Sequence, residues 1–342
     1  GTMYSIEEFK ERFSKIKGKT IAIVYIFEGD DDSGFNHFYI WKSNIISKWM
    51  NAVQELSCMP LIIDVRTFID KAINKTLPHI DYVINLNSGT YNLSSMALVP
   101  SMCSAINVPC IPCNAVSIVT GENKILSNYI ASSLGLNVPQ ELDKNNENGI
   151  FRPVSLGNSL GVQRGYPCNK QQGIYQEFIN GYEITTPLVY NAIEKKMDVL
   201  PTVVFAPLNN NPEWYYGESD KHKQQGYKFT LIKLDPKIEH KYVELANILS
   251  IKTFCRIDAR IKCCNKKAMI DTLESGADFD NTYFIEINVM PTIRDNNSFC
   301  YSFQSIKPST SIGKYIQLQK EMIGTINIHS FLLSSSMMAF IP

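Results

Sequence analysis

Three short apolar runs, separated by segments with helical spacing, dominate the first part of the chain. A run that is apolar at nearly every position is typical of a strand buried on both faces. Strands that alternate with helices predict a parallel sheet with right-handed crossovers, here over about the first 115 residues. The runs are TIAIVYIF (20–27), MPLIIDVRTF (59–68) and DYVINLN (81–87), and the helical segments are 6–16, 38–56 and 93–106.

The rest of the chain is less regular, and its end is apolar but short. Helices are predicted over 121–136, 238–251 and 311–323, and the polar, turn-rich segment 209–226 is predicted to be a long loop. The tail FLLSSSMMAFIP is broken by serines and is interpreted as a docked terminal segment. Gly1-Thr2-Met3 is interpreted as a cloning remnant and left out of fold reasoning.

Composition excludes several classes of protein. The 342 residues are 44% hydrophobic, and 33 basic residues balance 33 acidic ones, so the charge gives no argument for nucleic acid or an anionic membrane as a partner. No apolar run reaches the roughly 18 residues that span a bilayer. Nine cysteines without a secretory signal favour reduced thiols and a cytoplasmic location. The pair Cys110 and Cys113 is interpreted as small buried side chains rather than a zinc or redox site.

Two segments near the end of the chain carry an unusual polar row. As a strand, YFIEINVMPT (283–292) alternates its side chains between two faces. Phe284, Glu286, Asn288 and Met290 are then expected on one face, with Ile285, Ile287 and Val289 on the other. In FCRIDARI (254–261), the same alternation separates an apolar row from Arg256, Asp258 and Arg260.

If these two strands pair, three oxygen-bearing side chains converge. Asp258, Glu286 and Asn288 are hard oxygen ligands, with Arg256 beside them. A small number of protein oxygen ligands is what Mg²⁺ needs, because the ion keeps water molecules and accepts substrate phosphates for the rest of its coordination shell. The pattern therefore predicts a site for a magnesium–nucleotide complex.

Two further segments are candidates for contacts with the nucleotide. In FRPVSLGNSLGV (151–162), Arg152 is followed by glycines that flank Asn158 and Ser159. A glycine loop of this kind suits a phosphate, although an ordinary polar turn explains it equally well. It is neither a P-loop nor a dinucleotide fingerprint. In IYQEFINGYEI (174–184), a strand edge offers its backbone to an adenine and Glu183 a carboxylate to ribose, while the alternative is a hairpin with solvated glutamates.

Taken together and in order, these motifs resemble the ATP-grasp superfamily, and within it the D-alanine–D-alanine ligase branch. The resemblance runs from about residue 121 to residue 298, about half of the chain. By this resemblance, Lys124 corresponds to the family's phosphate-binding lysine. Arg152 corresponds to the basic residue that precedes a proline in the family's glycine-rich loop, and 157–161 correspond to the loop itself. The metal strands correspond to Arg256-Ile257-Asp258 and Glu286-Ile287-Asn288, and the hinge and ribose contacts to Gln176, Glu177, Phe178, Ile179 and Glu183.

The resemblance implies an α/β (α+β) chain of three domains. They are an N-terminal Rossmann-like domain over 1–118, a small central lid over 119–178 and a C-terminal ATP- and magnesium-binding domain over 179–342. The lid region is short for the family. Two explanations stay open: a reduced lid, or lid segments that the printed sequence omits. The resemblance also admits a homodimer.

The implied activity is an ATP-dependent carboxylate–amine ligase that works through an acyl phosphate on small amino-acid-like substrates. Asp258, Glu286 and Asn288 would hold Mg²⁺, or Mn²⁺ in its place, and Arg256 would stabilise the oxyanion. Lys124, Arg152 and the Asn158-Ser159 loop would hold the phosphates. Lys221, in the 209–226 loop, matches a lysine of the family's mobile loop with uncertain register.

The substrate side departs from the family. Arg152 stands in place of the usual lysine, and Thr292 in place of the glycine after Pro291. FEGDDDSGFNH and LNSGTYN replace the N-terminal signatures of the cell-wall enzymes, so that activity is not expected. Candidate substrate contacts are Arg294, Tyr216 and Glu28, each with an ordinary surface role as the alternative.

Two other classes of function were weighed. A nucleotide-binding module that has lost ligase activity fits the same motifs, although an intact set of metal ligands argues against it. A nicotinamide-dependent enzyme built on residues 20–110 lacks a GxGxxG after the first strand and is disfavoured.

Overall fold

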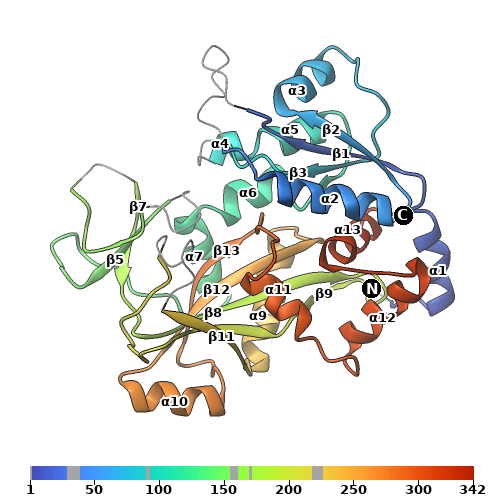
Figure 1. Ribbon diagram of the computed structural model, residues 1–342. Helices are drawn as coiled ribbons and strands as arrows, with labels where there is room; N and C mark the ends of the chain where they lie inside the picture. The colour runs from blue at the N-terminus through green and yellow to red at the C-terminus, as the bar shows by residue number, and fades with distance from the viewer. Residues whose placement is uncertain (1, 29–38, 90–92, 155–160, 169–171, 218–225) are drawn as a thin grey trace.

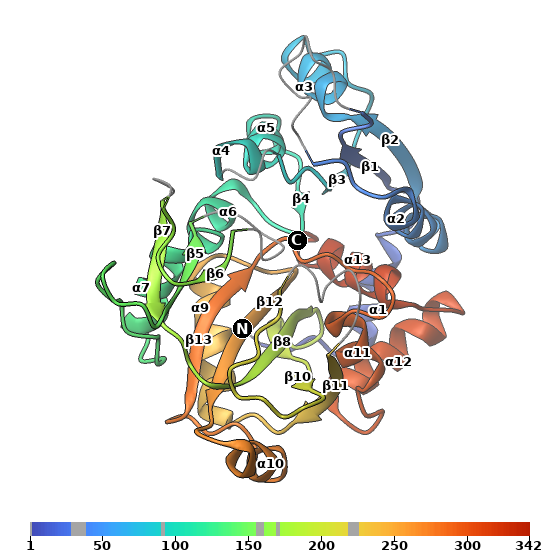
Figure 2. The same ribbon diagram turned by 60° about the vertical axis from the view of Figure 1, so that its left-hand side comes forward.

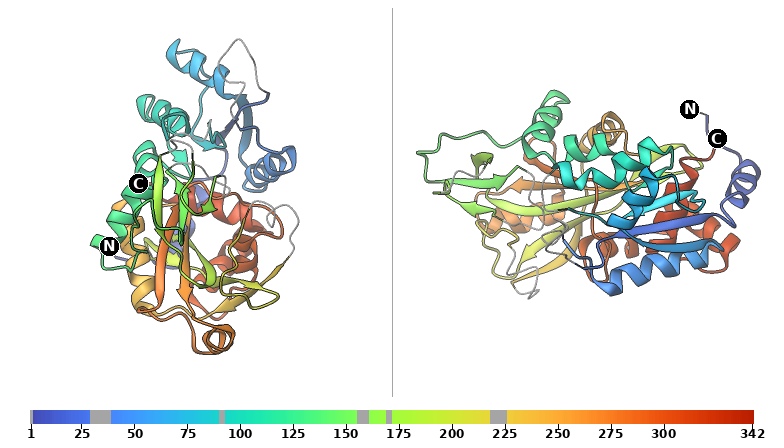
Figure 3. Two further views of the ribbon diagram at one scale, coloured as in Figure 1. Left: turned by 90° about the vertical axis from the view of Figure 1, so that its left-hand side faces the viewer. Right: turned by 90° about the horizontal axis from the view of Figure 1, so that it is seen from above.

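The computed structural model describes residues 2–28, 39–89, 93–154, 161–168, 172–217 and 226–342. The chain forms a four-stranded parallel sheet near its N-terminus, a large antiparallel sheet in its C-terminal half and a small three-stranded sheet at one end (Figure 1). Both termini lie at the end of the molecule opposite the small sheet (Figures 1 and 3).

The N-terminal sheet has the order β2-β1-β3-β4, and all its strands are parallel, as the sequence predicted. Strand β1 is apolar on both faces because helices cover both of them. In this part of the chain the elements are α1 (Ile6–Ser14), β1 (Thr20–Tyr25), α2 (Ser43–Glu55), β2 (Met59–Asp64), α3 (Val65–Ile73), β3 (Tyr82–Asn85), α4 (Leu93–Met96), α5 (Leu98–Ala105) and β4 (Cys110–Ile111).

Two helices connect the sheets, where one was predicted. Helix α6 (Ala115–Gly121) ends before Glu122, and α7 (Lys124–Ser133) begins after Asn123. The side-chain oxygen of Asn123 accepts hydrogen bonds from the backbone N–H groups of Ile125 and Leu126, which caps α7. The helix expected over 121–136 therefore starts three residues later, and Glu122 lies in the break.

The small sheet is antiparallel with the order β6-β5-β7 and forms the projecting end of the molecule (Figure 2). Its strands are β5 (Gly149–Pro153), β6 (Gln163–Arg164) and β7 (Gly173–Glu177). It occupies the region where the sequence predicted the lid. The domain boundaries themselves remain a prediction.

The large sheet has the order β11-β10-β8-β12-β13, with β9 paired to β8. Helix α9 (Pro236–Ile248) packs on one face, where Tyr242 and Leu245 join a core that contains Ile184 and Ile257. The strands are β8 (Gly181–Asn191), β9 (Lys196–Val199), β10 (Thr202–Pro207), β11 (Tyr227–Ile232), β12 (Phe254–Lys262) and β13 (Thr282–Asn288), and α10 (Lys266–Ser275) joins the last two.

The C-terminal helices join the two halves of the molecule. They are α11 (Ser298–Gln304), α12 (Ser311–Ile323) and α13 (Ile328–Met338). The predicted docked tail is α13, a buried helix that packs against α2, so one core contains Trp49, Ile84, Phe254 and Phe331. In the part of the chain that the structure describes, no helix is long and apolar enough to cross a membrane.

Candidate active site

A pocket of about 320 Å³ lies where the N-terminal half, the small sheet and the large sheet meet. A volume of this size suits a small-molecule ligand. Tyr39 and Trp41 line it from the N-terminal half, and Arg152 lines it from the small sheet. The predicted metal strands β12 and β13 line it from the large sheet, together with the segment that follows β13.

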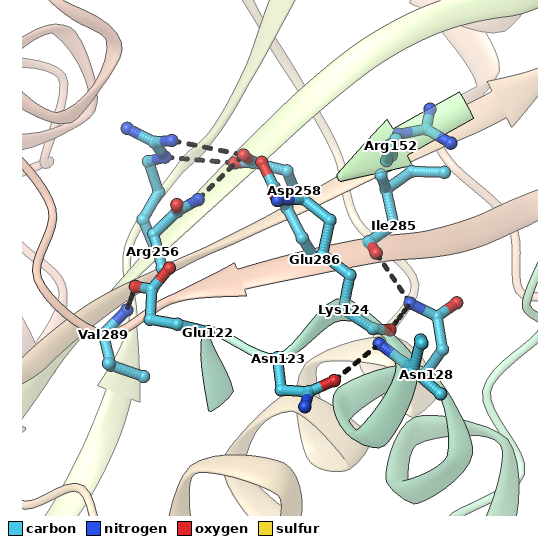
Figure 4. A network of polar contacts seen from close by, with 12 residues as sticks. Glu122, Asn123, Lys124, Asn128, Arg152, Arg256, Asp258, Ile285, Glu286 and Val289 are labelled. Atoms are coloured by element: carbon cyan, nitrogen blue, oxygen red, sulfur yellow. Dashed lines mark hydrogen bonds and ion pairs between the residues drawn. The ribbon is translucent and has the colours of Figure 1, made fainter. Parts of the chain in front are cut away.

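Strands β12 and β13 pair antiparallel, which was the condition for the predicted metal site. In their register Asp258 lies opposite Glu286, and Arg256 lies opposite Asn288. All four side chains line the pocket, and Figure 4 shows Arg256, Asp258 and Glu286 on these two strands. The row of Ile257, Ala259 and Ile261 faces the core, as expected from the alternation.

A bulge in β13 changes the predicted faces at two positions. The register shifts between Asp258 and Ala259, so that Glu286 pairs with Asp258 while Phe284 pairs with Ala259. Ile285 is the extra residue of the bulge and lines the pocket, whereas Phe284 is buried in the core. The expectation that Phe284 shares a face with Glu286, and Ile285 with the core row, was therefore wrong.

The carboxylate of Asp258 is held by three neighbours (Figure 4). Arg256 donates from Nε to Oδ1 at 3.0 Å and from Nη2 to Oδ2 at 3.2 Å. Nδ2 of Asn288 donates to Oδ2 at 2.9 Å, and the hydroxyl of Thr185 donates to Oδ1 at 2.6 Å. The oxygen of the Asn288 amide is thereby turned away from Asp258.

Lys124 approaches the same strands from the start of α7. Its ammonium nitrogen lies 3.7 Å from Oε2 of Glu286, and its side chain is buried. Burial raises the pKa of Glu286, Lys124 opposes this shift, and the nearby Asp258 carboxylate adds to it. The two opposed carboxylates of the strand pair thus repel each other, and a cation between them would relieve this repulsion.

Arg152 enters the pocket from β5. It is buried, and its Nη1 donates to Oε1 of Gln176 at 3.3 Å. Burial lowers the pKa of Arg152, while Glu286 and Glu183 favour its charged form. Because an arginine stays protonated at neutral pH, the pocket has a fixed cation on the side facing Glu286.

The predicted hinge, Gln176 to Ile179, is already engaged within the protein. Gln176 donates to Asn128 Oδ1 at 3.1 Å, and Glu177 accepts from the backbone N–H of Gln140. The Ile179 carbonyl accepts from Arg260 Nε at 2.6 Å. One backbone group of the predicted hinge, the Ile179 carbonyl, is therefore occupied by a buried arginine.

Arg260 was assigned no role from the sequence. It is 1% exposed, and its Nη2 donates to the carbonyls of Gly181 and Trp214 at 3.1 and 3.0 Å. Its Nη1 lies 3.3 Å from Oε1 of Glu183, the predicted ribose ligand. Burial lowers the pKa of Arg260 to about 10, so it remains a cation at neutral pH.

The predicted substrate contacts divide into two groups. Arg294 and Tyr216 line the pocket, and Tyr216 packs in an aromatic cluster with Phe205 and Tyr227. Glu28 does not line it; its side chain is exposed, and its carbonyl accepts from Arg66 at 3.2 Å. Asn158, Ser159 and Lys221 lie outside the described residues.

Glu122 is a further pocket residue to which the sequence assigned no role. Glu122 lines the pocket from the break between α6 and α7, and its Oε1 accepts the backbone N–H of Val289 at 2.9 Å (Figure 4). A predicted continuous helix over 121–136 gave this glutamate no special position. The Asn123 cap is the local signal that could have revealed the break.

The residues of the strand pair suit the predicted metal ion. Asp258, Glu286 and Asn288 carry hard oxygen atoms, which Mg²⁺ binds together with water or phosphate oxygens, although the Asn288 amide here presents its nitrogen to Asp258. The repulsion between the two carboxylates points the same way. The metal-binding role of these residues remains a prediction.

Solved structures with the same fold include D-alanine–D-alanine ligases. The enzyme from Bacillus anthracis aligns with a TM-score of 0.54 at 15% identity, over 90% of this chain and 97% of its own. The chain has the ATP-grasp fold of these ligases. The VanG D-Ala:D-Ser ligase from Enterococcus faecalis (TM-score 0.55, 13% identity) covers 90% of this chain and 100% of its own, and the Coxiella burnetii ligase (0.57, 10%) covers 90% and 94%.

The similarity extends over most of this chain but rests on shape. No family model and no curated protein sequence matches it. The Bacillus anthracis ligase has also been solved in complex with ATP, and that structure aligns with a TM-score of 0.55 at 15% identity, over 90% of this chain and 97% of its own. The fold predicted from the motifs is thus confirmed, whereas the activity has to be argued from this chain's own pocket.

Proposed function

We propose that this protein is an ATP-dependent carboxylate–amine ligase. One observation carries the proposal: the register of β12 and β13 brings Arg256, Asp258, Glu286 and Asn288 into one pocket. Lys124 and Arg152 supply two cations from other elements of the same pocket. Phosphoryl transfer requires carboxylates that bind a metal ion and cations that hold the phosphates, and this cavity contains both kinds of group.

The reaction proceeds in two steps. A substrate carboxylate oxygen attacks the γ-phosphorus of ATP, the bond to the β–γ bridging oxygen breaks, and ADP leaves. An amine then attacks the carbonyl carbon of the acyl phosphate, an amide bond forms, and phosphate leaves with the electron pair of the C–O bond and takes up the proton that the nitrogen loses. A magnesium ion bound by Asp258, Glu286 and Asn288 would neutralise negative charge on the phosphates.

The protein's own cations act at the other charged atoms. Lys124 and Arg152 hold phosphate oxygens, and their burial strengthens these interactions because little water screens them. Arg256 stabilises the oxyanion that forms when the amine attacks the acyl carbon. To reach that oxyanion, the guanidinium has to loosen its two hydrogen bonds to Asp258.

The substrates are small and amino-acid-like. Arg294 gives the pocket a cation for a carboxylate, and the pocket volume limits the size of the substrate pair. The altered N-terminal motifs separate this chain from the cell-wall enzymes. We therefore propose a different pair of amino-acid substrates, not D-alanine with itself.

The test is phosphate release from Mg-ATP against a panel of D- and L-amino acids, offered singly and in pairs. Release that requires a particular pair supports the ligase and identifies both substrates. Release with one compound alone indicates self-ligation or hydrolysis of the acyl phosphate. No release with any member of the panel contradicts the proposal for amino-acid substrates.

A second candidate is a nucleotide-binding module without ligase activity. The specific observation in its favour is Arg260, which occupies the Ile179 carbonyl and pairs with Glu183. Both groups were expected to contact ATP. Tight binding of Mg-ATP in calorimetry, without turnover across the panel, would favour this candidate.

A further inference from the structure

Glu122 is a pocket carboxylate that the steps above leave without a task. It lies between α6 and α7, and Oε1 accepts the Val289 N–H at 2.9 Å. Val289 directly follows Asn288, so this hydrogen bond fixes Glu122 beside the strand end that carries the metal-site residues. Oε2 has no hydrogen-bond partner among the described residues. Figure 4 shows the carboxylate below the Arg256 guanidinium, with its hydrogen bond to Val289 dashed.

Charge pairing distinguishes Glu122 from the other pocket carboxylates. Among the described residues that line the pocket, there are four such groups. Asp258 is paired with Arg256, Glu183 with Arg260, and Glu286 with Lys124. Glu122 forms no ion pair with any described residue, so its charge is available to a ligand.

The proposed reaction needs such a group. An amino-acid acceptor enters as an ammonium ion, and its nitrogen has no lone pair until it loses a proton. None of the cations that line the pocket can accept that proton, and the other three carboxylates are held by cations. A carboxylate placed beside the acyl phosphate meets both needs, since it attracts the ammonium and then accepts its proton.

We propose that Glu122 binds the ammonium group of the acceptor substrate and acts as the general base of amide formation. One N–H bond of the ammonium breaks, and its proton moves to Oε2. The nitrogen lone pair then forms the C–N bond as phosphate leaves, and the departing phosphate takes up a second N–H proton, which leaves a neutral amide. This inference rests on the proposed ligase function and adds to it the catalytic base and the class of acceptor, a protonated primary amine.

The surroundings of Glu122 suit a group that gains and loses a proton near neutral pH. Burial, together with the Glu286 carboxylate on β13, raises the pKa of Glu122 to about 7. The Val289 N–H, Lys124 on α7 and Arg256 on β12 act in the opposite direction. A base whose pKa lies close to the working pH accepts and releases protons efficiently.

The experiment separates activation of the acid from attack by the amine. Hydroxylamine is largely unprotonated at neutral pH and traps an acyl phosphate as a hydroxamate without needing a base. The wild type, Glu122→Gln, Glu122→Asp and the exposed control Glu321→Gln are each assayed with the amino-acid pair that releases phosphate. They are then assayed with the carboxylate donor alone plus hydroxylamine. Glutamine can still accept the Val289 N–H, so the fold of the break is kept.

We expect Glu122→Gln to lose amide formation by about 10²- to 10⁴-fold at neutral pH and to keep the wild-type rate of hydroxamate formation. Its residual amide rate rises with pH as the free amine becomes populated. Glu122→Asp recovers part of the loss, and Glu321→Gln behaves as wild type. Equal loss of both products in Glu122→Gln, or no loss of either, would overturn the role of Glu122. A wild type that forms no hydroxamate with any amino acid overturns the ligase itself, and with it this inference.

Discussion

The guanidinium of Arg256 forms two hydrogen bonds to the carboxylate of Asp258, two residues along the same strand. The proposed oxyanion ligand and the proposed metal ligand therefore neutralise each other in the structure. A divalent cation at Asp258 would compete with Arg256 for the same oxygens and free the guanidinium for the substrate. The two roles are coupled because they share one carboxylate.

The first prediction concerns stabilisation by Mg-ATP. Wild-type protein should gain about 2.7 kcal/mol of unfolding free energy when the ligand concentration is a hundred times its Kd. Asp258→Asn keeps the side-chain shape but removes the charge, so most of this gain should vanish. Thermal unfolding with and without Mg-ATP measures it. The exposed α10 variant Asp271→Asn should behave as wild type, and an Asp258→Asn protein with a full shift would contradict the metal assignment.

The second prediction concerns Arg260. Its side chain donates to the Ile179, Gly181 and Trp214 carbonyls and pairs with Glu183, so it ties β8 to the segment before β11. Arg260→Leu leaves these carbonyls without a donor and the glutamate without its partner. We expect a loss of about 3–5 kcal/mol in unfolding free energy, measured by urea denaturation.

Arg164→Leu is the matched control for Arg260→Leu. Both guanidinium groups lie over the Phe178 ring, at 4.7 Å for Arg260 and 4.2 Å for Arg164, but the Arg164 side chain is exposed. An exposed cation–π contact contributes about 0.5–1 kcal/mol, so this variant should change the unfolding free energy little. Similar losses of unfolding free energy in the two variants would show that the buried network around Arg260 stabilises the fold no more than the exposed contact of Arg164 does.

The metal strands could be found from the sequence because their chemistry is periodic. Arg256, Asp258 and Arg260 recur every second residue, and so do Glu286 and Asn288, and two such rows predict a polar face once the strands pair. The bulge at Ile285 could not be found this way. It depends on how two strands distant in sequence align, and no glycine or proline marks it.

Sequence patterns also could not predict the contacts of residues whose partners lie far away in the chain. Arg260 contacts carbonyls some 46 to 81 positions earlier in the chain, and nothing near Arg260 signals them. The tail was expected to dock, but its buried serines find partners on α12: Ser335 bonds to Tyr315 and Gln319. Serines that look polar in sequence are thereby satisfied inside the core.

The third prediction concerns the acceptor's carboxylate. Arg294 lines the pocket on the segment after β13, and its carbonyl accepts from Cys300 Sγ at 2.8 Å. Arg294→Gln should raise the KM for the acceptor about 10- to 100-fold, since a hydrogen bond to a charged group contributes about 1.5–3 kcal/mol. The KM for ATP should stay close to wild type. Lys314→Gln, on the exposed face of α12, is the control. An unchanged acceptor KM would remove Arg294 from the substrate site.

The fourth prediction concerns stability below neutral pH. His329 on α13 is 4% exposed, packs edge-on against Trp49, and places Nε2 3.1 Å from the Ile293 carbonyl oxygen. Burial lowers the pKa of His329 to about 4 from its usual 6.5. The folded protein therefore binds this proton less readily than the unfolded chain does.

The sign of the pH effect follows from that difference. Stability from the neutral imidazole is fully present above the unfolded pKa of about 6.5 and is lost as the pH falls toward the folded pKa. Between neutral pH and about pH 5, wild-type protein should lose about 2 kcal/mol through this group. Urea denaturation at both pH values measures the loss. His329→Gln should remove this part of the pH dependence, while the exposed His240→Gln should keep it. A wild type that is equally stable at both pH values would contradict the buried neutral imidazole and its contact with the Ile293 carbonyl.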